Sequence, residues 1–173
     1  MPAVAGAQDT IEVGARSVTR IGAFDTTSTQ FRSPVIRKAI RALGKPSNRF
    51  RTSDSSCAVK WRRLGLRIVF ANFGEPGAPP CGGRVGRAQS FTVQASDRLQ
   101  TWKGLRVGMP ESSVQQLHSG ARFVDDNRFY PDGWWLKSAR DVIGGGGRFP
   151  IVEARVRDGV VAAFDGWIGA AGD

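Results

Sequence analysis

Two stretches of the chain decide the expected fold: Ser33-Pro-Val-Ile-Arg-Lys-Ala-Ile-Arg-Ala-Leu-Gly44 and Pro110-Glu-Ser-Ser-Val-Gln-Gln-Leu-His-Ser-Gly120. In each stretch a proline precedes a glycine by 10 positions, and the two prolines are 76 positions apart. Proline fits the first turn of a helix, and glycine fits the position just after the last turn. The sequence therefore predicts one helix over residues 34–43 and a second over 110–118.

Each predicted helix is followed by a loop and then by a short apolar strand with a lysine at the corresponding position, Cys57-Ala-Val-Lys60 and Trp134-Trp-Leu-Lys137. Alternating apolar and polar residues predict the strands 57–62, 66–71, 91–96, 134–138, 151–157 and 160–167, and Asp158-Gly159 predicts a tight turn between the last two. We expect an α+β fold built as a tandem repeat, in which a helix is followed by three antiparallel strands and both helices cover one face of the sheet.

This pattern divides the chain into three parts. Residues 1–21 are expected to be a leader, partly disordered, with one edge strand near 11–18. Residues 22–101 and 102–173 are expected to be the first and second αβββ repeats. As written, the chain opens with neither the basic nor the apolar region of a signal peptide, and it holds no apolar run of about 18 residues that would predict a transmembrane segment.

The two cysteines, Cys57 and Cys81, lie in a predicted strand and in a loop rich in glycine and proline. A disulfide between them would tie that loop to the sheet and would persist in an oxidising compartment. Two free thiols are the alternative. Together with one histidine, two cysteines cannot form a usual zinc site, so we expect no metal and no cofactor.

The net charge of +10 is unevenly distributed. Residues 1–99 hold 16 basic and 6 acidic residues, whereas residues 100–173 hold 9 of each. A basic first half would attract an acidic surface, a polyanion or a nucleic acid. The alternative is an arginine-rich composition with no functional meaning.

Catalytic motifs are weak. His118 is the only histidine, and it is expected either at the surface or in the C-terminal turn of the helix, with Ser112, Ser113 and Ser119 near it in sequence only. The run from Gly144 to Gly147, followed by Arg148, is expected to be a flexible connector rather than an anion-binding nest. Three carboxylates of one loop could bind calcium, although their spacing is not that of an EF-hand: Asp125, Asp126 and Asp132.

Trp134 and Trp135 are neighbours in a predicted strand, so their side chains are expected to point to opposite faces of the sheet. Alignment with Cys57-Ala-Val-Lys60 places Trp134 and Leu136 in the core and Trp135 outside. An outward Trp135 would form the centre of a binding surface; packing of Trp135 by a neighbouring element is the alternative. The expected binding residues are Trp135, Lys137, Lys60, Arg62, Arg155, Arg157 and Trp167.

The pattern resembles the family of the β-lactamase inhibitory protein and, more broadly, the small outer-membrane-assembly lipoproteins. The residues that carry the resemblance are Gly104-Leu-Arg-Val-Gly108 leading into a helix, the pairs Pro110/Gly120 and Pro34/Gly44, and Gly159 in the last hairpin. In that family the open sheet face of the tandem repeat grips a partner protein. The resemblance therefore implies a secreted or otherwise extracytoplasmic binding module that is not an enzyme.

The expected function is thus the binding of a protein or an acidic envelope component through an open sheet face. The first alternative is a protein that binds polyanions or nucleic acid through its basic first half, and the second is a hydrolase whose site is not recognised. Binding that weakens steeply with salt would favour the first alternative.

Overall fold

The computed structural model describes residues 9–27, 34–71, 79–82, 86–125, 132–140 and 147–168. Within them, eight strands form one large antiparallel sheet in the order β4-β5-β6-β7-β12-β11-β10-β9. The strands are β4 (Asn48–Ser53), β5 (Ser56–Trp61), β6 (Leu66–Ala71), β7 (Arg87–Gln94), β9 (Arg122–Val124), β10 (Gly133–Arg140), β11 (Arg148–Arg157) and β12 (Val160–Trp167). Each half of the sheet is a meander, and the two meanders join where β7 pairs with β12.

A second, smaller sheet has the order β3-β2-β1-β8. It contains β1 (Asp9–Val13), β2 (Val18–Ile21), β3 (Phe24–Asp25) and β8 (Leu99–Thr101). The pairing of β1 with β8 is parallel and joins the beginning of the described chain to its middle. Residues that were expected to be leader and loop therefore form structured strands.

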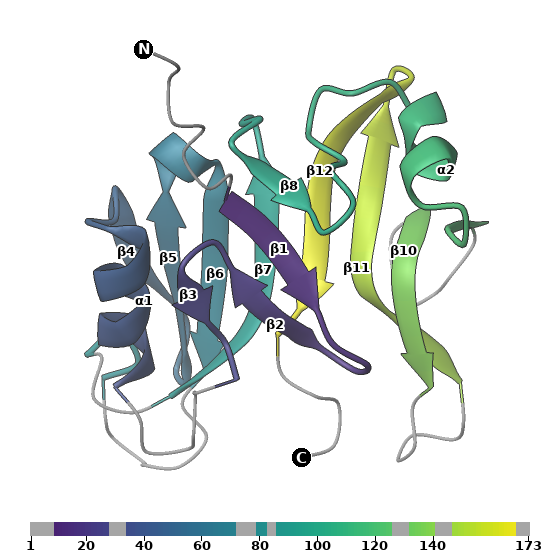
Figure 1. The fold of residues 1–173 in the computed structure, drawn as a ribbon. Helices are drawn as coiled ribbons and strands as arrows, with labels where there is room; N and C mark the ends of the chain where they lie inside the picture. Colours follow the sequence, from purple (N-terminus) through teal and green to yellow (C-terminus); the bar gives the residue numbers. More distant parts are fainter. Residues whose placement is uncertain are drawn as a thin grey trace.

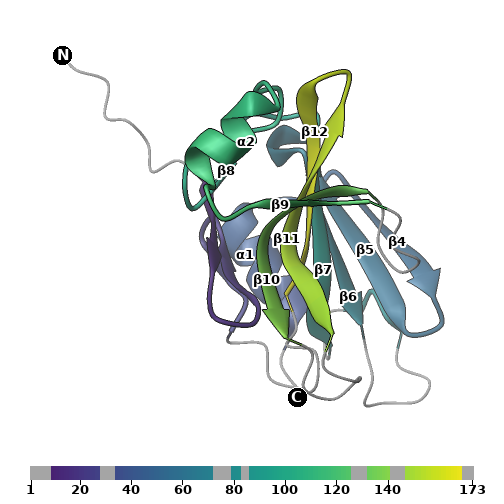
Figure 2. The same ribbon diagram turned by 90° about the vertical axis from the view of Figure 1, so that its right-hand side faces the viewer.

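Helices and the small sheet form a layer over one side of the large sheet. Figures 1 and 2 show α1 (Val35–Leu43), the small sheet and α2 (Ser112–Leu117) all on the same side. The opposite side of the large sheet is covered by no described helix or strand, and we call it the open face. A short 3-10 turn, η1 (Arg62–Leu64), links β5 to β6.

The core lies between these layers. The apolar side of α1 buries Val35, Ile36, Ala39 and Leu43, and Phe24 of the small sheet packs against Phe70 of β6. Two tryptophans attach the helices to the sheet. Trp61 Nε1 donates a hydrogen bond to the carbonyl oxygen of Gly44 (2.8 Å), and Trp134 Nε1 donates to Glu111 Oε1 (2.7 Å).

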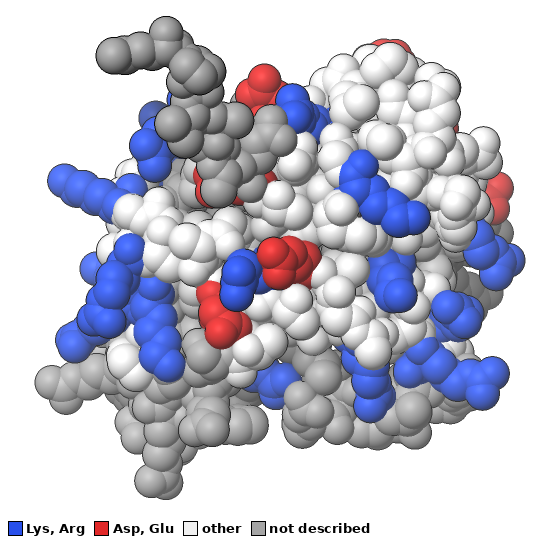
Figure 3. All heavy atoms as spheres, viewed as in Figure 1, with Lys and Arg blue, Asp and Glu red and all other residues white. Residues whose placement is uncertain are grey.

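Basic side chains of α1 lie on the covered side of the molecule. Arg37 and Arg41 are exposed, and Figure 3 shows Lys and Arg gathered over α1 at the left of that face. Lys60 and Arg67 instead lie on the open face, as the strand pairing described below demonstrates. The positive charge of the first half is therefore divided between two faces.

The expected tandem repeat of a helix and three strands is wrong. The described chain is mostly strand, with two helices and two sheets. Two of the strands, β4 and β9, occupy segments where a turn and a loop were expected. The predicted second helix, 110–118, is shorter and spans Ser112–Leu117, whereas the first is correct to within one residue.

The expected disulfide is confirmed. Cys57 and Cys81 are bonded, and their Cα atoms lie 5.1 Å apart. Cys57 is fully buried in β5, so the bond anchors a loop residue to the core of the large sheet. The hairpin turn is also confirmed, because Asp158 and Gly159 adopt positive φ angles of 51° and 74° between β11 and β12.

Candidate binding site on the open sheet face

One row of directly paired residues crosses the whole open face, one residue from each strand. Because direct cross-strand partners point to the same side of a sheet, these eight side chains share the open face. We call them the cross-strand row: Asn48, Lys60, Arg67, Thr92, Asp165, Glu153, Trp135 and Arg122.

The next row along the strands is apolar and faces the helices. It contains Val59, Ile68, Phe91 and Val152, all at most 2% exposed. The contrast between the two rows shows that alternation is maintained across the sheet, with one face for packing and the other for polar side chains.

The centre of the cross-strand row is a hydrogen-bonded network. Arg67 Nη2 donates to Thr92 Oγ1 (3.5 Å), and the Thr92 hydroxyl donates to Asp165 Oδ1 (2.7 Å). Asp165 Oδ2 lies 2.5 Å from Arg155 Nε in an ion pair. Arg155 is two residues from Glu153 on β11 and therefore lies on the same face.

Glu153 is the most unusual member of the row. Glu153 is only 4% exposed, and its Oε1 atom has no hydrogen-bond partner among the described residues. Burial, followed by the negative charge of Asp165, raises the pKa of Glu153 to about 7. The absence of a side chain at Gly133 makes room for it, because a Cβ there would lie 2.4 Å from Glu153 Oε1.

A pocket of about 330 Å³ opens beside this network. Arg67, Glu153, Arg155 and Asp165 line it, together with Trp167, which is 37% exposed. A concave site that combines an exposed aromatic ring with paired charges and a perturbed carboxyl group is typical of a binding site.

The structure places Trp134 and Trp135 on opposite sides of the sheet. Trp134 is partly buried and packs against the core and against Phe123. Trp135 is the cross-strand partner of Glu153 and is intermediate in exposure. The alternation argument thus assigned both faces correctly, whereas the binding role of Trp135 stays a prediction.

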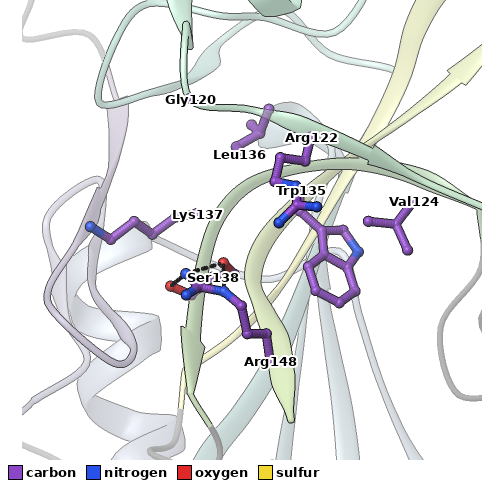
Figure 4. Close-up of a pocket in the computed structure, with 8 residues that line it drawn as sticks. All are labelled: Gly120, Arg122, Val124, Trp135, Leu136, Lys137, Ser138 and Arg148. Carbon is purple, nitrogen blue, oxygen red and sulfur yellow. Dashed lines mark hydrogen bonds between the residues drawn. The ribbon is translucent and has the colours of Figure 1, made fainter.

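Several predicted binding residues do not surround Trp135. Lys60 lies five strands away from Trp135 along the sheet order, which corresponds to about 24 Å at about 4.8 Å per strand. Arg62 is exposed and follows β5 in η1. Lys137 follows a β-bulge, and Figure 4 shows it pointing away from Trp135. Arg157 is exposed at the far end of β11.

His118 lies at the C-terminal end of α2, which is one of the two expected placements, but it is not at the surface, since it is only 2% exposed. Its Nε2 lies 2.8 Å from Thr101 Oγ1, and its ring and that of Trp102 form a T-shaped contact with their centroids 4.7 Å apart. Burial, followed by the charge of Lys103, lowers its pKa to about 4. Because His118 and Thr101 are both almost inaccessible, this pair stabilises the structure and offers no access to a substrate.

The other candidate sites gain no support. Among the described residues, no group of three or more His, Cys, Asp or Glu side chains could hold a metal ion. Asp126 and Gly144–Gly146 lie outside the described residues. Neither α1 nor α2, the helices of the described chain, has the length or apolarity to cross a membrane.

Sequence reasoning missed Glu153, Asp165, Thr92 and Arg67. A signal for Glu153 was present, since Glu153, Arg155 and Arg157 alternate with apolar residues in a predicted strand. No local signal indicates that Glu153 and Asp165 become direct partners at the middle of the sheet. The partnership depends on how β11 and β12 align.

Comparisons with known proteins identify no relative: no protein-family model, curated protein or solved structure matches the chain. The resemblance to the β-lactamase inhibitory protein family therefore remains a prediction.

Proposed function

We propose that the protein is a non-catalytic binding module that acts outside the cytoplasm and holds a partner protein on its open face. The observation that carries this proposal is the cross-strand row, which spans the eight strands of a sheet face that no helix or strand of the described chain covers. The Cys57–Cys81 disulfide supports an oxidising location.

The charge order along the cross-strand row favours a protein over a uniform polyanion. Positive Lys60 and Arg67 lie toward one end and Arg122 at the other, while Asp165 and Glu153 occupy the middle. A chain of regularly spaced negative charges would find no unpaired cation of the described residues at the middle of the face, because Arg155 is paired there with Asp165. A protein surface can present both signs in a matching order.

The division of basic residues between two faces also favours a protein partner over a polyanion. Arg37 and Arg41 lie on α1, on the opposite side of the sheet from Lys60 and Arg67. A polyanion or nucleic acid that follows one surface could not contact both groups at once. Binding through the basic first half is therefore the second candidate, favoured by the pocket of about 250 Å³ that Lys60, Arg62 and Arg67 line.

The test is capture by the immobilised protein from an extracytoplasmic extract, at low and high salt. Trp167→Ala removes an exposed aromatic from the open face, and Phe123→Ala removes one from the covered side, where Phe123 is 50% exposed. We expect one protein to be retained at high salt, to be lost with Trp167→Ala and to be kept with Phe123→Ala. Equal loss with both variants would overturn the proposal.

A parallel measurement with heparin and duplex DNA separates the two candidates. If the second candidate is correct, affinity for these polyanions decreases steeply with salt and falls when Lys60 or Arg67 is replaced by glutamine. If the proposal is correct, neither polyanion competes with the captured protein at high salt.

A further inference from the structure

A second pocket, of about 520 Å³, lies at the edge of the large sheet. It forms where β9 leaves β10, because β9 pairs only with Gly133–Trp135 and not with the rest of β10. Its lining includes Arg122 of β9, Trp135, Lys137 and Ser138 of β10, and Arg148 of β11. Figure 4 shows the side chains of Arg122 and Arg148 extending toward the same space, with the Trp135 ring beside them.

The charge of this pocket is one-sided. Arg122 and Arg148, whose side chains extend into it, are cationic, and none of the described lining residues is acidic. No ion pair within the described chain involves Arg122, Lys137 or Arg148. The central pocket differs, because there Arg155 is neutralised by Asp165.

Arg148 is held in a defined orientation. Its Nε and Nη2 atoms donate to Ser138 Oγ at 3.1 and 2.8 Å. Arg148 Nη2 also donates to the carbonyl oxygen of Ser138 (3.5 Å). Together these bonds fix the plane of the guanidinium and leave the N–H groups of Nη1 for another acceptor. A preorganised planar group with several donors loses less conformational entropy on binding an oxyanion than a freely rotating side chain does.

We propose that this pocket binds a carboxylate side chain that an acidic segment of the partner protein presents. Arg122 and Arg148 bind the carboxylate oxygens, and the Trp135 ring packs against the aliphatic part of the same side chain. The proposal rests on the proposed function, since the partner is the protein held on the open face. The cationic lining without an acidic residue among those described favours an acidic ligand.

The experiment measures the binding of a fluorescein-labelled hexaglutamate peptide by anisotropy. The variants are Arg122→Gln and Arg148→Gln, and the matched control is Arg63→Gln, an equal charge change at an exposed residue of η1. We expect the dissociation constant to rise about tenfold or more with either variant and less than about twofold with the control, in keeping with the loss of a charge-assisted hydrogen bond. Arg148→Lys keeps the positive charge but lacks the planar guanidinium. We expect it to bind the peptide more tightly than Arg148→Gln and less tightly than the parent protein.

A second readout locates the peptide. The indole N–H resonance of Trp135, assigned with Trp135→Phe, shifts when the peptide binds, and the other tryptophan resonances shift less. Inorganic phosphate and a heparin hexasaccharide are titrated in parallel. If either binds more tightly than the peptide and is weakened by the same variants, the pocket recognises phosphate or sulfate and the carboxylate assignment is wrong.

Two further outcomes overturn the inference: absence of peptide binding at millimolar concentration, and an equal loss with Arg63→Gln, which would indicate general charge attraction. Neither outcome affects the proposed function, because the capture experiment depends on Trp167 and Phe123 and on neither arginine of this pocket. Thermal melting of each variant verifies that it is folded.

Discussion

Glu153 on β11 and Asp165 on β12 are direct cross-strand partners, so two carboxyl groups face each other at the centre of the open face. Like charges in this position destabilise a sheet. The structure relieves the repulsion in two ways. Asp165 pairs with Arg155, and Glu153, buried beside it, has a pKa raised to about 7. Glu153 is therefore largely protonated below neutral pH.

Glu153 is expected to make the protein less stable as the pH rises. Between pH 4.5 and about 7 the carboxyl group is protonated in the folded state and ionised in the unfolded state. The folded state therefore binds one more proton than the unfolded state. The contribution of Glu153 to the free energy of unfolding is complete below pH 4.5 and is lost by about pH 7, which is a change of about 3 kcal/mol. Urea denaturation across this range should show the stability of Glu153→Gln rising relative to the parent protein by that amount. Parallel curves for the two proteins would show that Glu153 titrates normally.

His118 is expected to have the opposite effect. Its pKa of about 4 in the folded state lies below the ordinary histidine pKa of 6.5, so between these pH values the unfolded state binds one more proton than the folded state. Stability is complete above pH 6.5 and decreases by about 3 kcal/mol as the pH falls to 4. As the pH of the parent protein falls from 6.5 to 4.5, the stability lost through His118 offsets the stability gained through Glu153. The Glu153→Gln protein should therefore lose stability in acid, as urea denaturation at pH 6.5 and 4.5 will measure, and a flat profile would contradict the assignment to His118.

Loss of the disulfide is expected to destabilise the protein without changing its fold. The bond closes a loop with a sequence separation of 24, for which loop entropy predicts about 3 kcal/mol. Cys81→Ser tests this better than Cys57→Ser, because Cys57 is fully buried and a hydroxyl there would add its own cost. Calorimetry should show a melting temperature lower by about 6 to 12 °C for a chain of this size. An unchanged melting temperature in the variant would mean that the core alone holds residues 79–82 in place.

The elements predicted correctly have strong local signals. The α1 helix has a glycine with a positive φ of 86° at its end and apolar residues at helical spacing. The β11–β12 hairpin has Asp158-Gly159, which suits positive φ at both turn positions. In each case the residues that decide the element are neighbours in the sequence.

The missed elements lack such signals. β4 has the sequence Asn-Arg-Phe-Arg-Thr-Ser, and only Phe50 is not fully exposed, so an edge strand looks like a turn-rich loop. β8 has three residues and pairs with β1, some 90 positions earlier. The buried state of Glu153 likewise depends on which strands become neighbours. Sequence periodicity reports which face a residue occupies but not its partners across the sheet.

The two neighbouring tryptophans provide the sharpest test of the open face. Trp134 donates a hydrogen bond to Glu111 and packs against the core, so Trp134→Ala should lower the free energy of unfolding by about 2 to 4 kcal/mol. Trp135 lies on the open face opposite Glu153, so Trp135→Ala should cost much less stability but reduce affinity for the captured partner by about 2 kcal/mol or more. Urea denaturation and binding measurements on both variants separate the two effects, with Phe123→Ala as a control for loss of an exposed aromatic. If Trp135→Ala destabilises the protein as much as Trp134→Ala and leaves binding unchanged, Trp135 is a packing residue and the binding surface lies elsewhere.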